Sequence, residues 1–296
     1  MTNPNKISTI LNKINPKFKF KKSYIIYQKH NSIIYRILTE NNTFIVKVFQ
    51  SKGEAKEINC YSLLQEYNVP TLSVYGKTEK AILLEDLNNS LYWRLANEDD
   101  VSNEDVGRAV AKWYLKFHSA GKNILNSKKQ PDFLEREIDG LNAKVLFKIG
   151  EKYGLNKYLC WKLTIDNIEK LKTSIKDLPE TLNYNDFHWS NLALSKKDKI
   201  MDAIIFDYHL MGIGYKYSDC RNVINSLEGN AKDAFWEVYG EIDDKEKILD
   251  KPVSIIQALS VAMERSQFPQ WGKPLLNKIY NGEFDSNIRC ALDIID

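Results

Sequence analysis

Three short runs of β-branched and aromatic residues follow one another between residues 23 and 49, and they constrain the fold more than any other feature. SYIIYQ, SIIYRILT and TFIVKVF alternate in the manner of strands, and the turn-forming sequences KHN and ENN separate them. Asn, Asp and Gly favour turns because they tolerate turn backbone angles or hydrogen-bond their own backbone. The pattern predicts three consecutive strands.

The pattern changes to helical spacing after Gly53. Ile58, Tyr61 and Leu64 recur on one helical face, and the sequence NVP ends the predicted helix. LSVYGK and AILLEDL then have the composition of two further strands. Three strands, a helix and two strands predict a small β-rich N-terminal lobe, residues 1–88.

The remainder of the chain, residues 89–296, is predicted to be a larger, mainly helical lobe. Ser102 and Asp105 have the spacing of a capping box before a helix. Amphipathic helices are expected over residues 131–148 and 155–174, and further helices after Asp219. Two short strands, LALS and DAIIFDY, interrupt the helices. The predicted fold class is therefore α+β with two lobes.

Composition argues against several classes of protein. The 42 basic and 39 acidic residues nearly cancel, which predicts that nucleic acid is not a partner. The sequence contains neither an apolar run of about 18 residues for a membrane span nor an apolar N-terminal core for a signal peptide. The four cysteines occur singly, which predicts a reduced, cytoplasmic chain without a zinc site.

A polar cluster within an apolar setting gives the first indication of function. In LNYNDFHWSNLALS, Asp186 and Asn191 stand five positions apart between apolar flanks. Polar groups in such a segment must be paired, exposed in a cleft or engaged in chemistry. Lys47 lies within the apolar run FIVKVF, and Asp207 follows the apolar run AIIF. The interval D-x-x-x-x-N is that of a kinase catalytic loop.

These residue types are the ones that phosphoryl transfer from ATP requires. A lysine neutralises nucleotide phosphates, while a carboxylate and an asparagine amide bind magnesium through oxygen. A second carboxylate orients the attacking hydroxyl. Lys47, Asp186, Asn191 and Asp207 occur in the order that this arrangement needs. The sequence therefore predicts a kinase.

The segments YNDFHWSN and IIFDYHLMGIGYKYSD resemble motifs of the aminoglycoside phosphotransferase and choline kinase family of small-molecule kinases. The resemblance implies a two-lobed, protein-kinase-like fold and the cofactors ATP and Mg²⁺. It places Asp186 at the catalytic position, and Asn191 and Asp207 at metal-ligand positions. Asp219 corresponds to a structural aspartate at the start of the next helix.

The resemblance extends to the nucleotide-binding elements. KEINCYSLLQEYNVP is similar to the family's R-E-x-x-x-x-x-L helix. This similarity implies that Glu57 pairs with Lys47. AILLEDL is similar to the hinge segment, which implies that the main chain from Glu85 to Leu87 binds adenine. On a helix, a glutamate in the position of Glu57 is otherwise interpreted as a solvated surface residue.

The chain departs from the family pattern at two places. Tyr184 stands where the family usually has histidine. No glycine precedes Gly53, so QKHNSI must cover the phosphates without the close backbone approach that glycine permits. Asn31 and Ser32 are the predicted phosphate contacts in this loop. These departures keep open a second hypothesis, a catalytically silent, kinase-like binding module.

The phosphate acceptor is predicted only as a small molecule with a hydroxyl group. An aminoglycoside needs clustered carboxylates, for which Glu264, Asp243 and Asp244 are candidates. A choline-like or ethanolamine-like acceptor needs aromatic side chains around its cation, although aromatic residues at helical spacing also pack in cores. The aromatic candidates are Trp189, Trp271, Phe268 and Tyr280.

Two histidines near the predicted site, His188 and His209, are interpreted as residues that cap or brace loops. The sequence leaves the oligomeric state open.

Overall fold

The structure, a computed structural model, describes residues 4–29, 32–127, 130–196 and 200–295. The chain divides into two compact units. Unit 1 contains residues 1–133, 184–211 and 222–240, and unit 2 contains residues 134–183, 212–221 and 241–296. Both units are therefore assembled from segments that are distant in the sequence. Unit 1 continues past residue 88, and the boundary predicted there between two lobes stays a prediction.

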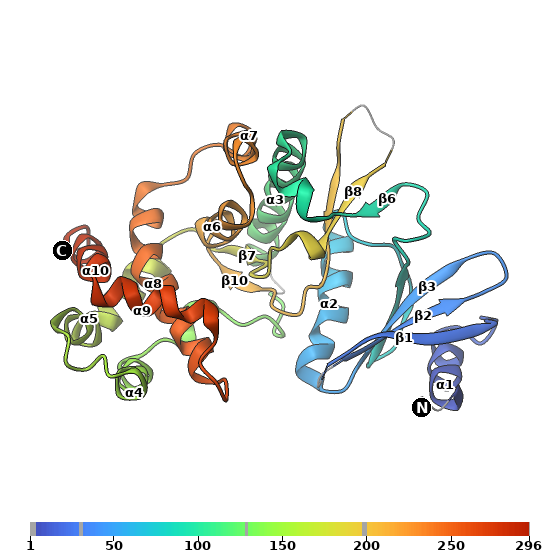
Figure 1. Cartoon of the computed structure of the whole chain (residues 1–296), viewed down its shortest axis with the longest axis horizontal. Helices are drawn as coiled ribbons and strands as arrows, with labels where there is room; N and C mark the ends of the chain where they lie inside the picture. Colours follow the sequence, from blue (N-terminus) through green and yellow to red (C-terminus); the bar gives the residue numbers. More distant parts are fainter. Residues whose placement is uncertain (1–3, 30–31, 128–129, 197–199, 296) are drawn as a thin grey trace. The chain divides into compact units, whose positions relative to one another are not determined.

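Unit 1 contains a five-stranded antiparallel sheet with the strand order β1-β2-β3-β5-β4 (Figure 1). Every second residue of β2 is buried, as expected for a strand with apolar and polar sides in alternation. Four of the five strands lie within the segments that the sequence pattern predicts, and β1 begins one residue before its predicted segment. The five strands are β1 (Lys22–Gln28), β2 (Ser32–Leu38), β3 (Thr43–Phe49), β4 (Val74–Lys77) and β5 (Ala81–Glu85).

One face of this sheet is covered by a helix that the sequence analysis did not predict, α1 (Pro4–Ile14). Ile7 and Leu11 of α1 are buried in a cluster with Tyr35, Val46 and other residues of the sheet. The signal was present in the sequence, because Ile7 and Leu11 have the i, i+4 spacing of one helical face.

The opposite face of the sheet carries Arg36, Ile45 and Lys47. Arg36 is paired with Ile45 across β2 and β3, and Lys47 lies two residues beyond Ile45, so the three side chains share one face. Helix α2 (Lys52–Glu66) follows β3 and begins six residues before the apolar face predicted from Ile58. The face of the sheet that carries Arg36 and Ile45 therefore supplies Lys47 to the candidate site.

Unit 1 also contains a three-stranded sheet, 3₁₀ helix η1 (Glu98–Ser102) and two long helices. Asn103, rather than Ser102, caps α3, because its side chain accepts a 2.8 Å hydrogen bond from the Asp105 main-chain N–H. The capping box predicted at Ser102 is therefore wrong. The remaining elements are β6 (Trp93–Leu95), β8 (Leu192–Ser195), β9 (Ala203–Ile205), η3 (Trp189–Asn191), α3 (Glu104–Leu125) and α7 (Asn230–Tyr239).

Unit 2 is mainly helical. Its core includes the fully buried side chains of Leu146, Trp161, Ile256 and Phe284. Two strands form a small antiparallel sheet, β7 (Thr181–Asn183) and β10 (Gly212–Gly214). The helices are η2 (Glu137–Gly140), α4 (Ala143–Tyr153), α5 (Leu159–Lys176), α6 (Lys216–Ser226, shared with unit 1), α8 (Asp244–Met263), η4 (Gln270–Gly272), α9 (Lys273–Tyr280) and α10 (Glu283–Asp293).

Some elements of both units have bounds that differ from the predicted ones or were not predicted at all. The helix expected over residues 131–148 begins only at Ala143, because the Asn142 side chain accepts from the Val145 N–H and caps it there. The strands β6, β7 and β10 were not predicted, since each has three residues and is too short to show an alternating pattern.

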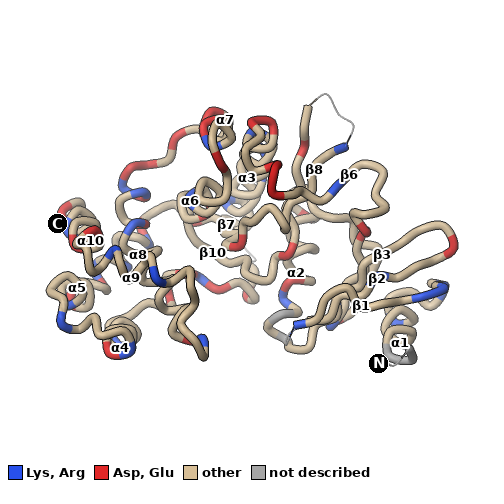
Figure 2. The backbone as a smooth tube through the Cα atoms, in the orientation of Figure 1, with Lys and Arg blue, Asp and Glu red and all other residues tan. Residues whose placement is uncertain are grey.

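Charged residues of both signs occur in both units. Figure 2 shows acidic and basic residues interspersed through both units. In the part of the chain that the structure describes, no helix combines the length and apolarity needed to cross a bilayer. That nucleic acid is not a partner stays a prediction.

Candidate active site

The segment from Tyr184 to Asn191 forms a closed loop between β7 and β8. The Asn191 Nδ2 donates to the Asp186 Oδ2 at 3.0 Å and to the Asp186 main-chain oxygen at 3.1 Å. The Phe206 N–H donates to the Asn191 main-chain oxygen at 3.1 Å, which ties the loop to the end of β9. Asn185 has a φ of 68°, a left-handed conformation that asparagine tolerates better than most residues. The five-residue interval is therefore the length that closes this loop.

Asp207 follows β9 directly and accepts two hydrogen bonds on one oxygen. Lys47 Nζ and His209 Nδ1 each lie 2.8 Å from Asp207 Oδ1. Burial alone would raise the pKa of Asp207, but the hydrogen bonds and charges of His209 and Lys47 outweigh burial and hold the pKa well below its usual range. The backbone of Asp207 also has a left-handed conformation, with a φ of 68°. Its carboxylate is ionised at neutral pH.

Lys47 joins Asp207 to helix α2. Its Nζ lies 2.6 Å from Glu57 Oε2, and Lys47 and Glu57 are only 7% and 1% exposed. Glu57 is therefore not the solvated surface residue that an isolated helical glutamate usually is. The predicted pairing forms, while its role in nucleotide binding stays a prediction.

The carboxyl groups of this cluster differ in their pKa. Burial raises the pKa of Asp186, His209 opposes that shift, and the nearby Asp207 carboxylate adds to it. Burial likewise raises the pKa of Glu57, to about 7. The pKa of Asp207 moves in the other direction. Titratable groups whose environments separate their pKa values are typical of catalytic sites.

Tyr184, the departure from the family pattern, has a defined structural role. Its side chain is fully buried, and its hydroxyl donates to the Phe206 main-chain oxygen at 2.6 Å. The ring lies edge-on to Trp113 and Tyr208. Tyr184 therefore attaches the loop to the residue that precedes Asp207.

The two histidines have different positions. His188 is exposed and caps η3, where its Nδ1 accepts from the Ser190 N–H at 3.3 Å. His209 contacts Asp207 directly. The sequence interpretation as bracing residues did not identify this contact, although the D-x-H spacing places the two side chains within reach.

The predicted adenine-binding segment follows the end of β5. The Glu85 N–H donates to the Ser73 oxygen at 3.0 Å, and its carboxylate accepts from the Ser73 hydroxyl at 3.0 Å. Leu87 is 7% exposed. Among the described residues, no acceptor meets the Leu87 main-chain N–H. A main-chain N–H in a buried residue usually has an acceptor, and a bound ligand is one way to supply it.

The predicted phosphate contacts are described only in part. Ser32 is the first residue of β2, where its main-chain oxygen accepts from the Lys29 N–H at 3.0 Å. Asn31 lies outside the described residues. Both assignments stay predictions.

The acidic acceptor candidates do not form one cluster. Asp243 caps the start of α8, where it accepts from the Lys245 N–H, and Asp244 pairs with Lys247 at 2.9 Å. Glu264 lies at the other end of the same 20-residue helix, about 30 Å away at 1.5 Å per residue. These carboxylates cannot bind one small molecule together.

The aromatic candidates take part in separate contacts. Tyr153 packs on Phe268, Tyr158 packs on Tyr280, and the Arg265 guanidinium lies 5.7 Å from the Trp271 ring centre. Trp189 belongs to unit 1 and lies against His188. The described ring contacts form separate pairs rather than one aromatic box.

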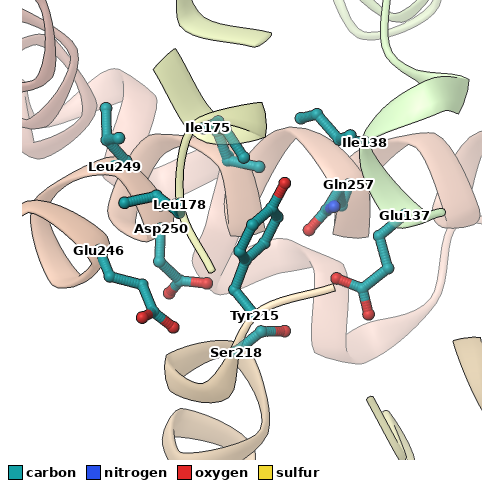
Figure 3. Close-up of a pocket in the computed structure, with 11 residues that line it drawn as sticks. Glu137, Ile138, Ile175, Leu178, Tyr215, Ser218, Glu246, Leu249, Asp250 and Gln257 are labelled. Atoms are coloured by element: carbon teal, nitrogen blue, oxygen red, sulfur yellow. The ribbon is translucent and has the colours of Figure 1, made fainter. Parts of the chain in front are cut away.

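Unit 2 encloses a small cavity of about 20 Å³, room for about one water molecule. Figure 3 shows the Tyr215 ring in the middle of its lining, with Glu137 on one side and Asp250 and Glu246 on the other. None of the predicted site residues is among the described residues that line it. The Tyr217 N–H and Arg221 each donate to one of these carboxylates, at 2.6 Å to Glu246 and 2.6 Å to Asp250.

The donor set at the candidate site fits magnesium when phosphate oxygens complete the coordination. Among described residues, no three His, Cys, Asp or Glu side chains gather in a group that could hold a metal ion alone. Magnesium is usually bound by one or two protein carboxylates together with substrate phosphates and water. Asp207 is an ionised carboxylate, and the Asn191 nitrogen is committed to Asp186, which leaves the Asn191 Oδ1 for a cation.

Comparisons with solved structures identify the fold. The chain is similar to spectinomycin phosphotransferase solved with ADP and spectinomycin, with a TM-score of 0.63, 13% identity and coverage of 98% of both chains. A choline/ethanolamine kinase family protein from Mesorhizobium loti matches with a TM-score of 0.64, 10% identity and coverage of 97% of this chain and 98% of that chain. The choline kinase LicA from Streptococcus pneumoniae matches with a TM-score of 0.59, 11% identity and coverage of 97% and 99%.

No protein-family model matches this sequence, and no curated protein sequence matches it either. At 10 to 13% identity the structural similarities show the fold. They confirm the predicted α+β, protein-kinase-like fold and the resemblance on which that prediction rested.

Proposed function

We propose that this protein is an ATP-dependent phosphotransferase that moves the γ-phosphoryl group of ATP to a hydroxyl of a small molecule. The observation that supports it best is the connected cluster in unit 1. Lys47 links Glu57 to Asp207 by direct contacts of 2.6 and 2.8 Å. The Asp186–Asn191 loop is attached to the segment just before Asp207.

In this proposal, Lys47 binds the α- and β-phosphates, and Glu57 holds it in position. The Lys47 ammonium now contacts Asp207, and it exchanges part of that contact for phosphate oxygens when ATP binds. Glu85 and Leu87 contact adenine through the main chain, and the free Leu87 N–H is the donor. Ser32 and Asn31 contact the phosphates.

Asn191 and Asp207 are the proposed magnesium ligands. The ion, when bound, neutralises charge that develops on the phosphate oxygens. Asp207 supplies the anionic oxygen, and its low pKa keeps it ionised. His209 holds the Asp207 carboxylate in place through a 2.8 Å hydrogen bond.

Asp186 is the proposed catalytic residue. Its free lone pairs accept a hydrogen bond from the acceptor hydroxyl, and the carboxylate takes the proton late because the transition state is loose. The raised pKa of Asp186 makes it a better proton acceptor than an exposed aspartate. Asn191 fixes the orientation of the carboxylate.

The acceptor belongs to the aminoglycoside-like, choline-like or related amino-alcohol or sugar classes. Spectinomycin phosphotransferase and choline kinase are among the structural neighbours, by their own descriptions. No contact in the described chain favours one of these classes over the others, since neither candidate set forms a cluster.

The test combines nucleotide binding with acceptor-stimulated turnover. Thermal denaturation with and without ATP and Mg²⁺ is expected to show stabilisation by the complete nucleotide complex. Release of ADP is then measured with choline, ethanolamine, aminoglycosides and sugars, and at least one class should stimulate it at least about tenfold. Binding without stimulated turnover would favour the catalytically silent module. If the protein does not bind the nucleotide, the proposal is contradicted.

A further inference from the structure

A buried ion pair fixes the segment that follows β5. Arg36 Nε lies 2.6 Å from Asp86 Oδ2, and Arg36 Nη2 donates to Asp86 Oδ1 at 3.1 Å. The pair therefore combines one hydrogen bond with a close charge contact. Asp86 is 3% exposed, so its carboxylate is largely shielded from water.

The same guanidinium holds the residue on the other side of Leu87. With its amide oxygen toward Arg36, Asn88 accepts from Arg36 Nη2 at 2.8 Å and from Nη1 at 3.2 Å. The Asn88 N–H in turn donates to Asp86 Oδ1 at 3.2 Å. Arg36 therefore binds both neighbours of Leu87, the residue whose main-chain N–H has no acceptor among the described residues.

The sheet register explains how Arg36 reaches this segment. Arg36 of β2 pairs with Ile45 of β3, and Ile45 pairs with Leu84 of β5, so the three side chains form a row on one face. Lys47 lies on the same face, two residues further along β3. The Arg36 side chain crosses over β3 along this row and meets the chain two residues after Leu84.

We propose that Arg36 is a positioning residue for nucleotide recognition, which holds the main chain of residues 85–88 in the conformation that binds the base. This inference rests on the proposed function. A segment that is already ordered loses less conformational entropy on binding, so its contacts contribute more to affinity. Arg36 acts through Asp86 and Asn88 and does not need to touch the nucleotide.

The inference makes a specific distinction between two parts of the nucleotide. Residues 85–88 meet the base, whereas Lys47, Asn191 and Asp207 meet the phosphates and the metal. Loosening residues 85–88 should weaken the binding of ligands that carry adenine and leave the binding of ligands without a base unchanged. A general loss of structure would weaken both kinds of ligand.

The experiment measures the affinity of ADP with Mg²⁺ and of tripolyphosphate with Mg²⁺, by calorimetry, for the wild-type chain and the Arg36→Lys variant. Lysine keeps the charge but lacks the planar guanidinium that contacts Asp86 and Asn88 at once. We expect the variant to bind ADP about tenfold more weakly and tripolyphosphate within about twofold of wild type. Asp86→Asn should have the same effect, and the double variant should lose little more than either single variant.

Arg94→Lys is the matched control. Arg94 forms a bidentate pair with Asp100 in the same unit, with two contacts of 2.7 Å, away from residues 85–88. Its replacement should lower the melting temperature by a similar amount but leave the ADP affinity unchanged.

Equal ADP affinity in wild type and Arg36→Lys would overturn the inference, as would parallel losses for ADP and tripolyphosphate. Failure of the wild-type chain to bind either ligand would instead overturn the proposed function. Because the first two results require a wild-type chain that binds, the two failures are distinguishable.

Discussion

Each unit contains a partly buried group of carboxylates and a buried tyrosine, and the two groups differ in how their members are connected. In unit 1, Asp186 and Asp207 have pKa values displaced in opposite directions, upward by burial and downward by His209 and Lys47 respectively. In unit 2, burial raises the pKa of both Glu246 and Asp250.

The carboxylates of the two units also differ in the groups that they bind. Glu246 binds the start of α6 through the Tyr217 N–H, and Asp250 binds Arg221 of the same helix, so both carboxylates connect α8 to α6. Lys47 of unit 1 contacts two carboxylates and so connects them to each other. A group of carboxylates is therefore not in itself a catalytic site; the separation of the pKa values and a cation shared between two carboxylates distinguish the candidate site from the group in unit 2.

The largest expected effect comes from removing the negative charge of Asp186. Asp186→Asn should lower turnover by about a thousandfold or more, while ADP affinity stays within about threefold of wild type. The amide keeps the loop hydrogen bond but cannot accept the proton from the acceptor. Steady-state ADP release and calorimetry give the two quantities. Parallel losses of turnover and binding would instead assign Asp186 to a structural network like that of unit 2.

A smaller effect is expected at Asp207. Asp207→Ala should weaken nucleotide binding in the presence of Mg²⁺ by about 10- to 100-fold, because the anionic ligand is lost. Without Mg²⁺ the variant and the wild type should differ much less. Calorimetric titrations with ADP in magnesium and in chelator measure the difference. An unchanged magnesium-dependent affinity would contradict the assignment of Asp207 as a ligand.

The two buried tyrosines give a matched pair for stability. Tyr184→Phe leaves the partly buried Phe206 carbonyl without the donor that it has in the wild type, and should lower the free energy of unfolding by about 1–3 kcal/mol. Tyr215 is 9% exposed, and its hydroxyl meets no partner among the described residues, so Tyr215→Phe should change stability by less than about 0.5 kcal/mol or increase it. Urea denaturation measures both. Equal losses would mean that the two hydroxyls are equally well satisfied.

The smallest expected effect is a pH dependence in unit 2. The pKa of Glu246 is raised by burial; its stabilising contribution is therefore fully present below its unfolded pKa and is lost as the pH rises through its folded pKa. Relative to Glu246→Gln, wild type should be most stable at low pH. The comparison uses urea midpoints across pH 4 to 8.

Asp100 is the control with the opposite sign. The hydrogen bond from Arg94 lowers the pKa of Asp100, so its contribution is present above its unfolded pKa and is lost as the pH falls through its folded pKa. Stability differences that change in the same direction for Glu246→Gln and Asp100→Asn would contradict the assignment of these shifts.

Local patterns in the sequence determined the main elements and the short-range geometry of the candidate site. Alternation between residues 23 and 49 predicted three strands, since side chains on a strand repeat every two residues. The interval between Asp186 and Asn191 predicted a short loop, because both of its ends lie within the same few residues of the chain. Such features depend on positions a few residues apart, and the order of residues along the chain carries them.

The tertiary structure decided which distant residues meet. Lys47 and Asp207 are 160 residues apart, and only the packing of β3 beside the end of β9 brings them to 2.8 Å. Arg36 reaches Asp86 because the strand order places β2 and β5 on either side of β3. A shift of one residue in that register would turn Arg36 to the other face of the sheet.

Local sequence patterns could show neither where the acidic candidates lie in space nor what Tyr184 binds. The spacing of the acidic candidates Asp243 and Glu264 could not place them in space, and in the structure helix α8 holds them at its opposite ends. Tyr184 differed from the family pattern in identity, and only the position of the Phe206 carbonyl revealed what the longer side chain binds. Periodicity is a local property that the sequence shows directly, whereas contacts depend on how complete elements pack, and that was decided by the three-dimensional structure.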